Sequence, residues 1–311
     1  MRKKAVIALG GNALIKPGQE GTIYEQFENT RNISISIVKI IKEDWDVVIT
    51  HGNGPQVGAI LLQNDLAKDV TPPMPLGICV AESEGFIGYM IQQCISNALK
   101  KANIDRSVVT LITQVLVDED DPSFKNPTKP IGPYYSDDEV EEIREEGFQL
   151  KKEADGWRIV VPSPDPKSIV EGEIIKRMLE ENIIVIASGG GGMPVIEKEG
   201  WGLAGLEAVI DKDLASERLA EAIDAELLLI LTNVEKVTLN YKTNHEKSID
   251  KVTIEDLKKY YHEGHFPSGS MGPKILAAIR FIEAGGKKVI ISSVEKGWQA
   301  FNGETGTIIT K

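Results

Sequence analysis

The chain has 311 residues, of which 41% are hydrophobic and 26% are charged, proportions that are ordinary for a globular protein. Its 47 acidic residues outnumber its 35 basic residues, and the formal net charge is -12. This balance argues against general binding to nucleic acids or to anionic membranes. An anion pocket on such a protein must therefore be built from a few well-placed cations.

The two cysteines and the apolar segments indicate the compartment. If Cys79 and Cys94 lie on one helix, they are roughly 22 Å apart, which is too far for a disulfide, so we expect buried, reduced thiols. No segment has the apolar length of a membrane span, and the run Ala5–Leu9 is too short for a signal peptide. We expect a cytoplasmic protein that contacts neither membranes nor nucleic acids.

Short apolar runs alternate with longer segments of helical periodicity along most of the chain. Strands are predicted at Ala5–Leu9, Asp46–Thr50, Val108–Thr113, Trp157–Val161, Ile183–Ala187, Ala208–Ile210, Leu227–Leu231, Lys288–Ile291 and Thr307–Ile309. Helices are predicted at Tyr24–Lys42, Gln56–Ala67, Ala81–Lys101, Val170–Glu181, Leu214–Ile223, Ile254–Glu263 and Ile275–Glu283. All-apolar strands that alternate with helices indicate an α/β fold with a mostly parallel sheet covered on both faces.

This alternation stops between Leu116 and Pro166. The segment is rich in proline and contains a dense acidic run at Asp137–Glu146. It also contains the strand-like Trp157–Val161, so we interpret it as an inserted subdomain or lid rather than as a linker.

Three predicted strands end in glycine-rich turns, at Gly10-Gly11-Asn12, Gly52-Asn53-Gly54 and Gly189–Gly192. Ligands of open parallel sheets bind beyond the carboxyl ends of the strands, where glycine lets backbone N–H groups approach phosphate oxygens. A single such turn is more often a tight connection, but three of them favour an anion pocket.

Two lysines lie in the first turns of predicted helices, Lys212 after Asp211 and Lys274 after Pro273. A lysine there opposes the helix dipole, and an anion bound at the helix N-terminus removes the conflict. Each lysine alone could simply be solvated, but the pair favours function. Asp211 is the natural N-cap of its helix, whereas Asp213 could either suit the dipole or orient nearby lysines.

Other motifs carry less weight. The dinucleotide-like pattern Gly200–Gly205 does not follow a buried strand, so we predict a hairpin there. His262 and His265 lack an obvious third ligand, and we predict no metal site. The sequence contains no P-loop signature and no nucleophile elbow, so any ATP chemistry must use a different scaffold.

Eight blocks of the sequence resemble the carbamate kinase family of the amino-acid-kinase superfamily, in the family's order and spacing. They are Ala8–Leu14, Thr50–Gly58, Pro127–Tyr135, Trp157–Pro166, Ala187–Val195, Val209–Ser216, Leu231–Val237 and Gly269–Lys274. The resemblance runs nearly end to end and is far more specific than any lone glycine motif.

The resemblance implies one domain over residues 1–311. Its fold would be a three-layer αβα sandwich around an open, mainly parallel sheet of about eight strands, with a small protruding subdomain at 116–166. The N-terminal part would bind carbamate and residues 187–311 would bind the nucleotide. A homodimer is the usual assembly in the family.

The resemblance also assigns roles to individual residues. Lys129, Lys212 and Lys274 would contact the transferring phosphoryl group or the nucleotide phosphates, and Asp213 would hold the lysines in place. The residues expected around carbamate are Gly10, Gly11, Asn12, Gly52, Asn53 and Gly54. Those expected at the nucleotide are Gly189, Gly190, Gly191, Lys212, Ser270, Met271 and Lys274. Position in the chain alone places the adenine contacts at Asn233–Tyr241.

Lys129 has a particular meaning in this resemblance. Many superfamily relatives carry a lysine just before the first Gly-Gly, but here that stretch reads Ile7-Ala8-Leu9. In carbamate kinases a lysine of the protruding subdomain takes its place, and Lys129 matches that position.

The expected reaction is reversible, in-line phosphoryl transfer between ATP and carbamate, with Mg²⁺ on the nucleotide phosphates. Carbamate is already an anion, so no general base is needed, and catalysis would consist of positioning and charge neutralisation. Two alternatives remain open: an acylphosphate-forming kinase of another small acid, and a nucleotide-binding regulator that has lost catalysis.

Overall fold

A computed structural model describes residues 2–16, 18–153, 156–266, 269 and 271–311, with the side chain of Asn12 excepted. Within these residues an eight-stranded sheet has the order β15-β17-β16-β12-β1-β2-β9-β3. In that order the strands are Lys251–Thr253, Thr307–Thr310, Lys288–Ser293, Leu227–Thr232, Lys3–Leu9, Trp45–His51, Ile184–Ile186 and Val108–Thr110. All pairs are parallel except β16 with β17. The predicted open, mainly parallel sheet is thus confirmed.

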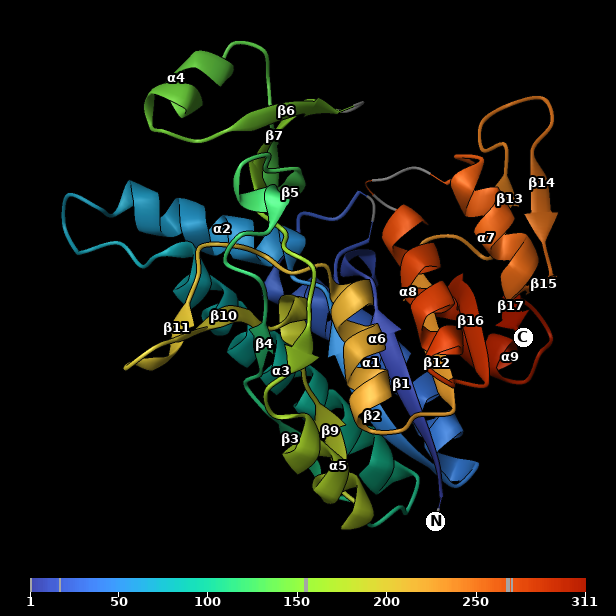
Figure 1. Cartoon of the computed structure of the whole chain (residues 1–311). Helices are drawn as coiled ribbons and strands as arrows, with labels where there is room; N and C mark the ends of the chain where they lie inside the picture. The colour runs from blue at the N-terminus through green and yellow to red at the C-terminus, as the bar shows by residue number, and fades with distance from the viewer. Residues whose placement is uncertain (1, 17, 154–155, 267–268, 270) are drawn as a thin grey trace.

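Helices cover both faces of this sheet (Figure 1). The helices of the described residues are α1 (Ile23–Lys42), α2 (Gly54–Leu66), α3 (Leu76–Lys101), α4 (Val140–Glu145), α5 (Gly172–Glu180), α6 (Lys212–Ala222), α7 (Ile254–His262), α8 (Met271–Glu283) and α9 (Gly297–Phe301). Helices α1, α3 and α9 pack on one face, and α5, α6, α7 and α8 pack on the other.

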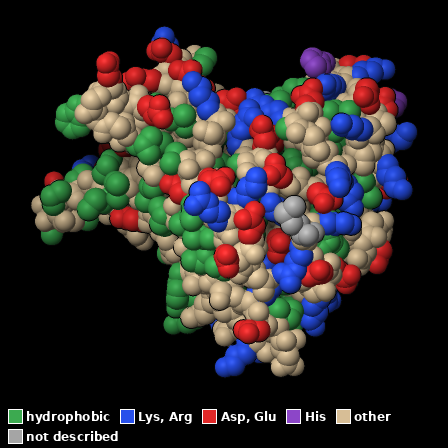
Figure 2. Space-filling model, turned by 60° about the horizontal axis from the view of Figure 1, so that its bottom comes forward, with side chains coloured by type: hydrophobic (Ala, Val, Ile, Leu, Met, Phe, Trp, Pro, Cys, Tyr) green, Lys and Arg blue, Asp and Glu red, His purple; other side chains and the backbone are tan. Residues whose placement is uncertain are grey.

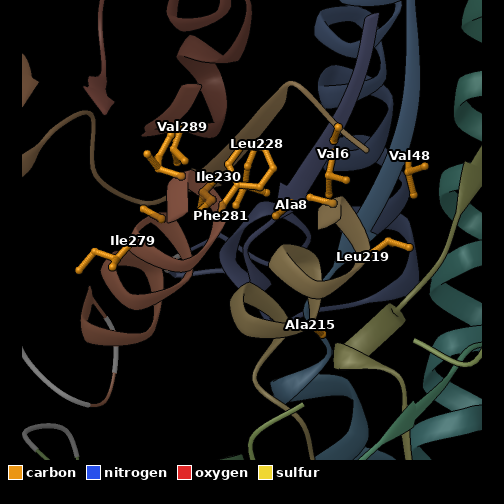
Figure 3. Close-up of a cluster of buried hydrophobic side chains, with 14 of the residues drawn as sticks. Val6, Ala8, Val48, Ala215, Leu219, Leu228, Ile230, Ile279, Phe281 and Val289 are labelled. Carbon is orange, nitrogen blue, oxygen red and sulfur yellow. The ribbon is translucent and has the colours of Figure 1, made fainter. Parts of the chain in front are cut away.

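Strand β1 shows why the layers form. Ala5, Ile7 and Leu9 point to the core under α1 and α3, whereas Val6 and Ala8 point to the core under α6 and α8. A strand with both faces buried must be apolar throughout, and β1 is from Ala5 onward. Figure 3 shows the core between the sheet and helices α6 and α8, with residues of β1, β2, β12 and β16 facing side chains of the two helices.

A separate three-stranded sheet projects from the sandwich together with α4, at the top of Figure 1. Its strands are β5 (Lys129–Tyr135), β7 (Gly156–Val161) and β6 (Leu150–Glu153), paired antiparallel. They lie within the segment where the strand–helix alternation of the sequence stops. The projection therefore carries Lys129 at the start of its first strand.

Two smaller sheets complete the fold. One has the order β11-β10-β4-β8 and the other pairs β13 with β14. Their strands are Gly202–Gly205, Met193–Lys198, Gln114–Leu116, Ser168–Ile169, Val237–Leu239 and Lys247–Ile249. The pairing of β10 with β11 confirms the hairpin predicted around Gly200–Gly205.

Two local predictions were wrong. Ala208–Ile210 is buried but forms no strand, because Ala208 N–H donates to Leu206 O within a local turn and Val209 N–H donates to Pro162 O, so no continuous ladder forms. The strand predicted at Val108–Thr113 exists as β3 but ends at Thr110, and the next strand, β4, begins at Gln114 in the smaller sheet. Cys79 and Cys94 are buried free thiols, as expected.

Among the described residues, no helix has the length and apolarity to cross a bilayer.

Candidate active site

The glycine turns of β1 and β2 meet at the carboxyl ends of these neighbouring strands. Gly10 N–H donates to Leu231 O at 2.8 Å, and Gly52 N–H donates to Leu9 O at 3.0 Å, which ties the turns to the sheet. A Cβ on Gly52 would lie 3.2 Å from both the Gly11 nitrogen and Lys212 Cδ. Only glycine leaves this space open, so the backbone itself forms the floor of the site.

Asp213 lies between two of the predicted lysines. Its Oδ1 forms an ion pair with Lys212, and its Oδ2 accepts from Lys274 Nζ at 3.0 Å. The carboxylate side chain is 3% exposed and the two lysine side chains are 11% and 13% exposed. Asp211 caps the same helix by accepting from Asp213 N–H at 2.9 Å, as its sequence position predicted.

The charges in this cluster stabilise one another. Burial opposes ionisation of Asp213, but Lys212 and Lys274 outweigh it and hold the pKa of the carboxyl well below its usual range. Burial lowers the pKa of Lys212, whereas for Lys274 the attraction of Asp213 and Asp211 exceeds the effect of burial and raises the pKa. The site thus holds two ammonium groups aligned by one carboxylate.

A third lysine reaches the site from the projecting sheet. Lys129 Nζ lies 2.6 Å from Asp211 Oδ2, so β5 is joined to the start of α6 by an ion pair. Arg158 of β7 lines the same pocket and donates to Gly132 O at 2.9 Å. Sequence reasoning did not single out Arg158, although it lies in the Trp157–Pro166 block.

The tetraglycine turn after β9 also lies at this pocket. Gly190, Gly191 and Gly192 have φ values of 64°, 97° and 84°, which favour glycine. A Cβ on Gly190 would lie 2.1 Å from Asn53 Nδ2, so the turn rests directly on the Asn53 side chain. The turn was expected at the nucleotide, but its contacts lie beside the residues expected around the acceptor.

These residues line a pocket of about 310 Å³. Its walls are Gly10, Gly11, Gly52, Asn53, Gly54, Pro55, Lys129, Pro130, Ile131, Arg158, Gly190, Val209, Ile210, Asp211, Lys212, Asp213, Thr232, Asn233, Gly269 and Lys274. A second pocket of about 570 Å³ is lined by Thr232, Asn233, Val234, Glu235, Lys236, Thr238, Tyr241, Glu246, Ser248, Phe266, Met271 and Lys274. Because Thr232, Asn233 and Lys274 line both, the two pockets adjoin.

The fold therefore brings together residues predicted from distant parts of the chain. Met271 and the Asn233–Tyr241 segment line the larger pocket, apart from the smaller pocket's glycines. Ser270 lies outside the described residues, and so does the side chain of Asn12. Sequence reasoning missed Ser83 and Glu84, which contact Asn53 and Gly189. The periodicity of a helix does not indicate which distant turns pack against its buried face.

The amino acid kinase family model matches residues 3–293. The chain belongs to the amino acid kinase family. Carbamate kinase of Pyrococcus horikoshii is 54% identical over 314 residues, covering 100% of both chains. The structures of Giardia lamblia carbamate kinase bound to citric acid and bound to AMP-PNP have TM-scores of 0.94 and 0.91, with 42% and 44% identity, covering 100% of this chain and 99% of each.

Membership of this family agrees with the chemistry of the smaller pocket. Lysines, a glycine-lined floor and a buried aligning carboxylate can bind an anion and spread its charge, whereas the described walls offer no cysteine or histidine nucleophile. The larger pocket, which meets it at Lys274, has room for a bulkier and partly apolar group.

Proposed function

We propose that the protein is a carbamate kinase, which transfers a phosphoryl group reversibly between ATP and carbamate. The observation that carries this proposal is the convergence of Lys129, Lys212 and Lys274 on one glycine-lined pocket. The full-length similarity to curated carbamate kinases supports the same acceptor.

In this proposal, the lysines neutralise the oxygens of the phosphoryl group as it passes in line from ADP oxygen to carbamate oxygen. Asp213 fixes the directions of Lys212 and Lys274. The acceptor lies against Gly10, Gly11, Asn12, Gly52, Asn53 and Gly54. The carbamate oxygen is already anionic, so the reaction needs no proton transfer at that atom.

Mg²⁺ would enter as part of the nucleotide complex. Asp211 and Asp213 are engaged by lysines, and the described residues contain no cluster of three or more His, Cys, Asp or Glu that could hold a metal. Such a site suits a cation held mainly by phosphate oxygens and water. When bound, Mg²⁺ would offset charge on the nucleotide phosphates.

The larger pocket would hold the nucleoside. It adjoins the transfer pocket at Lys274, and its walls include Tyr241, Phe266 and Met271, whose apolar surfaces suit an adenine ring. A related carbamate kinase has been crystallised with AMP-PNP, a nucleotide analogue. We accordingly assign residues 187–311 to nucleotide binding, except for the tetraglycine turn at Gly189–Gly192, which rests on Asn53 beside the acceptor. We assign the N-terminal part to carbamate and 116–166 to a lid.

We further propose that the protein forms a homodimer in the cytoplasm. Large apolar side chains are exposed on α1 and α3, including Ile35, Ile78 and Tyr89, and Figure 2 shows hydrophobic side chains gathered along one edge of the molecule. Such surfaces favour self-association. Light scattering on the purified protein would test the dimer.

The deciding experiment measures ATP formation from ADP, Mg²⁺ and carbamoyl phosphate in a coupled assay, with Lys274→Ala as the control. Rapid ATP formation by the natural protein alone supports the proposal. Activity only with other acylphosphates would indicate another small acid as the acceptor. Tight ADP binding without turnover on any acceptor would indicate a silent regulator.

A further inference from the structure

Helix α3 passes behind the substrate turns and presents two polar residues to them. Ser83 and Glu84 are 0% and 1% exposed, although the neighbouring buried positions Val80 and Ile87 are apolar. Burying a hydroxyl and a carboxyl costs free energy unless they make specific interactions. Their contacts therefore deserve a functional explanation.

Each of the two residues contacts a different turn of the site. Ser83 Oγ accepts from Asn53 Nδ2 at 2.9 Å and donates to Val80 O at 2.7 Å. Glu84 Oε1 accepts from Gly189 N–H at 2.9 Å. Because a helix is stiff, the two contacts fix the Asn53 turn and the tetraglycine turn relative to each other.

His51 completes this arrangement. A Cβ on Gly189 would lie 2.5 Å from His51 Nε2 and 2.8 Å from Glu84 Cγ, so the glycine is held between the two side chains. His51 Nδ1 lies 3.2 Å from Gly52 O, and the imidazole Nε2 and Glu84 Oε2 are both buried without a hydrogen-bond partner. Both side chains therefore lie beside Gly189, and no hydrogen bond compensates a charge on either of these two buried atoms.

The surroundings of Glu84 favour the uncharged acid. No salt bridge of the described residues includes Glu84, and the titratable groups near it are His51 of β2 and Glu171 before α5. Burial raises the pKa of Glu84 to about 8, against the Thr113 and Gly189 hydrogen bonds, and burial lowers the pKa of His51 to about 4. At neutral pH both groups are therefore uncharged.

We propose that Ser83 and Glu84 are positioning residues that hold Asn53 and the tetraglycine turn around the acceptor, and that Glu84 does so as a neutral carboxylic acid. Neither touches the reacting atoms. An ionised Glu84 would place a buried, unpaired negative charge beside a site that binds anions. This inference rests on the proposed carbamate kinase function.

The test compares Glu84→Gln, Glu84→Ala and Ser83→Ala with the matched control Glu82→Gln, an exposed residue of the same helix. Glutamine keeps the acceptor for Gly189 N–H and replaces the O–H donor with N–H. KM for carbamoyl phosphate, kcat and ADP affinity are measured from pH 6 to pH 9.5, with circular dichroism to verify folding.

We expect Glu84→Gln to keep kcat and KM within about twofold of the natural protein at pH 7. We expect Glu84→Ala and Ser83→Ala to raise KM for carbamoyl phosphate at least tenfold and to leave ADP affinity unchanged, because the larger pocket does not include the two turns. An unchanged KM in folded Glu84→Ala, or an equal loss in Glu84→Gln, would overturn the inference.

The pH profile supplies a readout that a purely structural role would not move. The natural protein should lose carbamoyl phosphate affinity as pH rises through about 8, and Glu84→Gln should remove that loss while Glu82→Gln keeps it. Identical alkaline profiles for the natural protein and Glu84→Gln would contradict a neutral Glu84. If the natural protein formed no ATP at all, the proposed function itself would fail, whatever the variants did.

Discussion

Lys129 and Asp211 are separated by 82 positions in the chain, yet Lys129 Nζ and Asp211 Oδ2 lie 2.6 Å apart. The ion pair joins the projecting sheet to the N-cap of α6, one residue before Lys212. The same aspartate thus orders the start of the helix and holds the lysine of the projection at the pocket.

Lys129→Ala should lower kcat for ATP formation by about 100-fold or more, because one cation at the phosphoryl group is removed. Lys125→Ala, at an exposed position of the same segment, is the matched control and should stay near the natural rate. ADP affinity by calorimetry should change little in either variant. A near-normal kcat in Lys129→Ala would remove that residue from the mechanism.

Lys212→Ala and Lys274→Ala should each lower turnover by about 10³-fold while the fold persists, since the charge they supply acts in a water-poor pocket. Single-turnover kinetics in the coupled assay measure the effect. The turnover of Asp213→Asn should fall by a comparable factor, because the two buried ammonium groups then repel each other without the carboxylate that aligns them. Turnover close to natural in Asp213→Asn would mean that the lysines are positioned by other groups.

Gly58 of α2 meets Gly132 of β5 with no room for a side chain: a Cβ on Gly58 would lie 1.9 Å from Gly132 Cα. Gly58→Ala should push the projecting sheet away from α2 and displace Lys129, which begins the same strand. We expect kcat to fall at least tenfold, with ADP affinity nearly unchanged. Gly205→Ala is the control, because a Cβ on Gly205 would meet no atom within 4 Å, and it should leave kcat unchanged. Gly54 does not serve as a control because it lines the pocket.

Glu217 of α6 predicts a pH dependence of stability. It is fully buried, neither carboxyl oxygen has a hydrogen-bond partner among the described residues, and burial raises its pKa to about 7. An acid with a raised folded pKa contributes stability that is complete below about pH 4.5 and is lost as pH rises through the folded value.

We measure the free energy of unfolding in urea for Glu217→Gln and for the natural protein. The value for Glu217→Gln minus that for the natural protein should rise between about pH 4.5 and pH 7 and stay constant above about pH 7. The total change should be on the order of 3 kcal/mol. Glu221→Gln, one turn further along and more exposed, is the control and should follow the natural protein. A constant difference across this pH range would show that Glu217 is ionised in the folded state.

Tyr241→Ala should weaken ADP binding about tenfold, because an aromatic wall of the proposed nucleoside pocket is removed. KM for carbamoyl phosphate should stay within about twofold. Isothermal titration calorimetry measures the ADP affinity. Tyr24→Ala, at an exposed position of α1, is the control. Equal ADP affinities in the three proteins would place the adenine elsewhere.

The order of apolar runs, helical segments and glycine turns along the chain predicts the layers of the fold and much of the site. Apolar strands such as Val6–Leu9 are stable only when both of their faces are covered. Ordering a glycine turn such as Gly10-Gly11 costs conformational entropy, and such a turn is typical of places where a ligand approaches the backbone closely. These are local constraints, and each is readable from a few neighbouring residues. The same logic predicted Asp211 as an N-cap and left the role of Asp213 open.

Which of these residues come into contact is set by the packing of the folded chain. The contacts of Asp213 with Lys274, of Lys129 with Asp211 and of Glu84 with Gly189 span long separations in the chain, and no local periodicity encodes them. Ala208–Ile210 failed as a strand for the same reason, since its partners are Pro162 and neighbouring loops rather than a sheet. Pairing depends on how the layers stack, and that is a property of the whole chain.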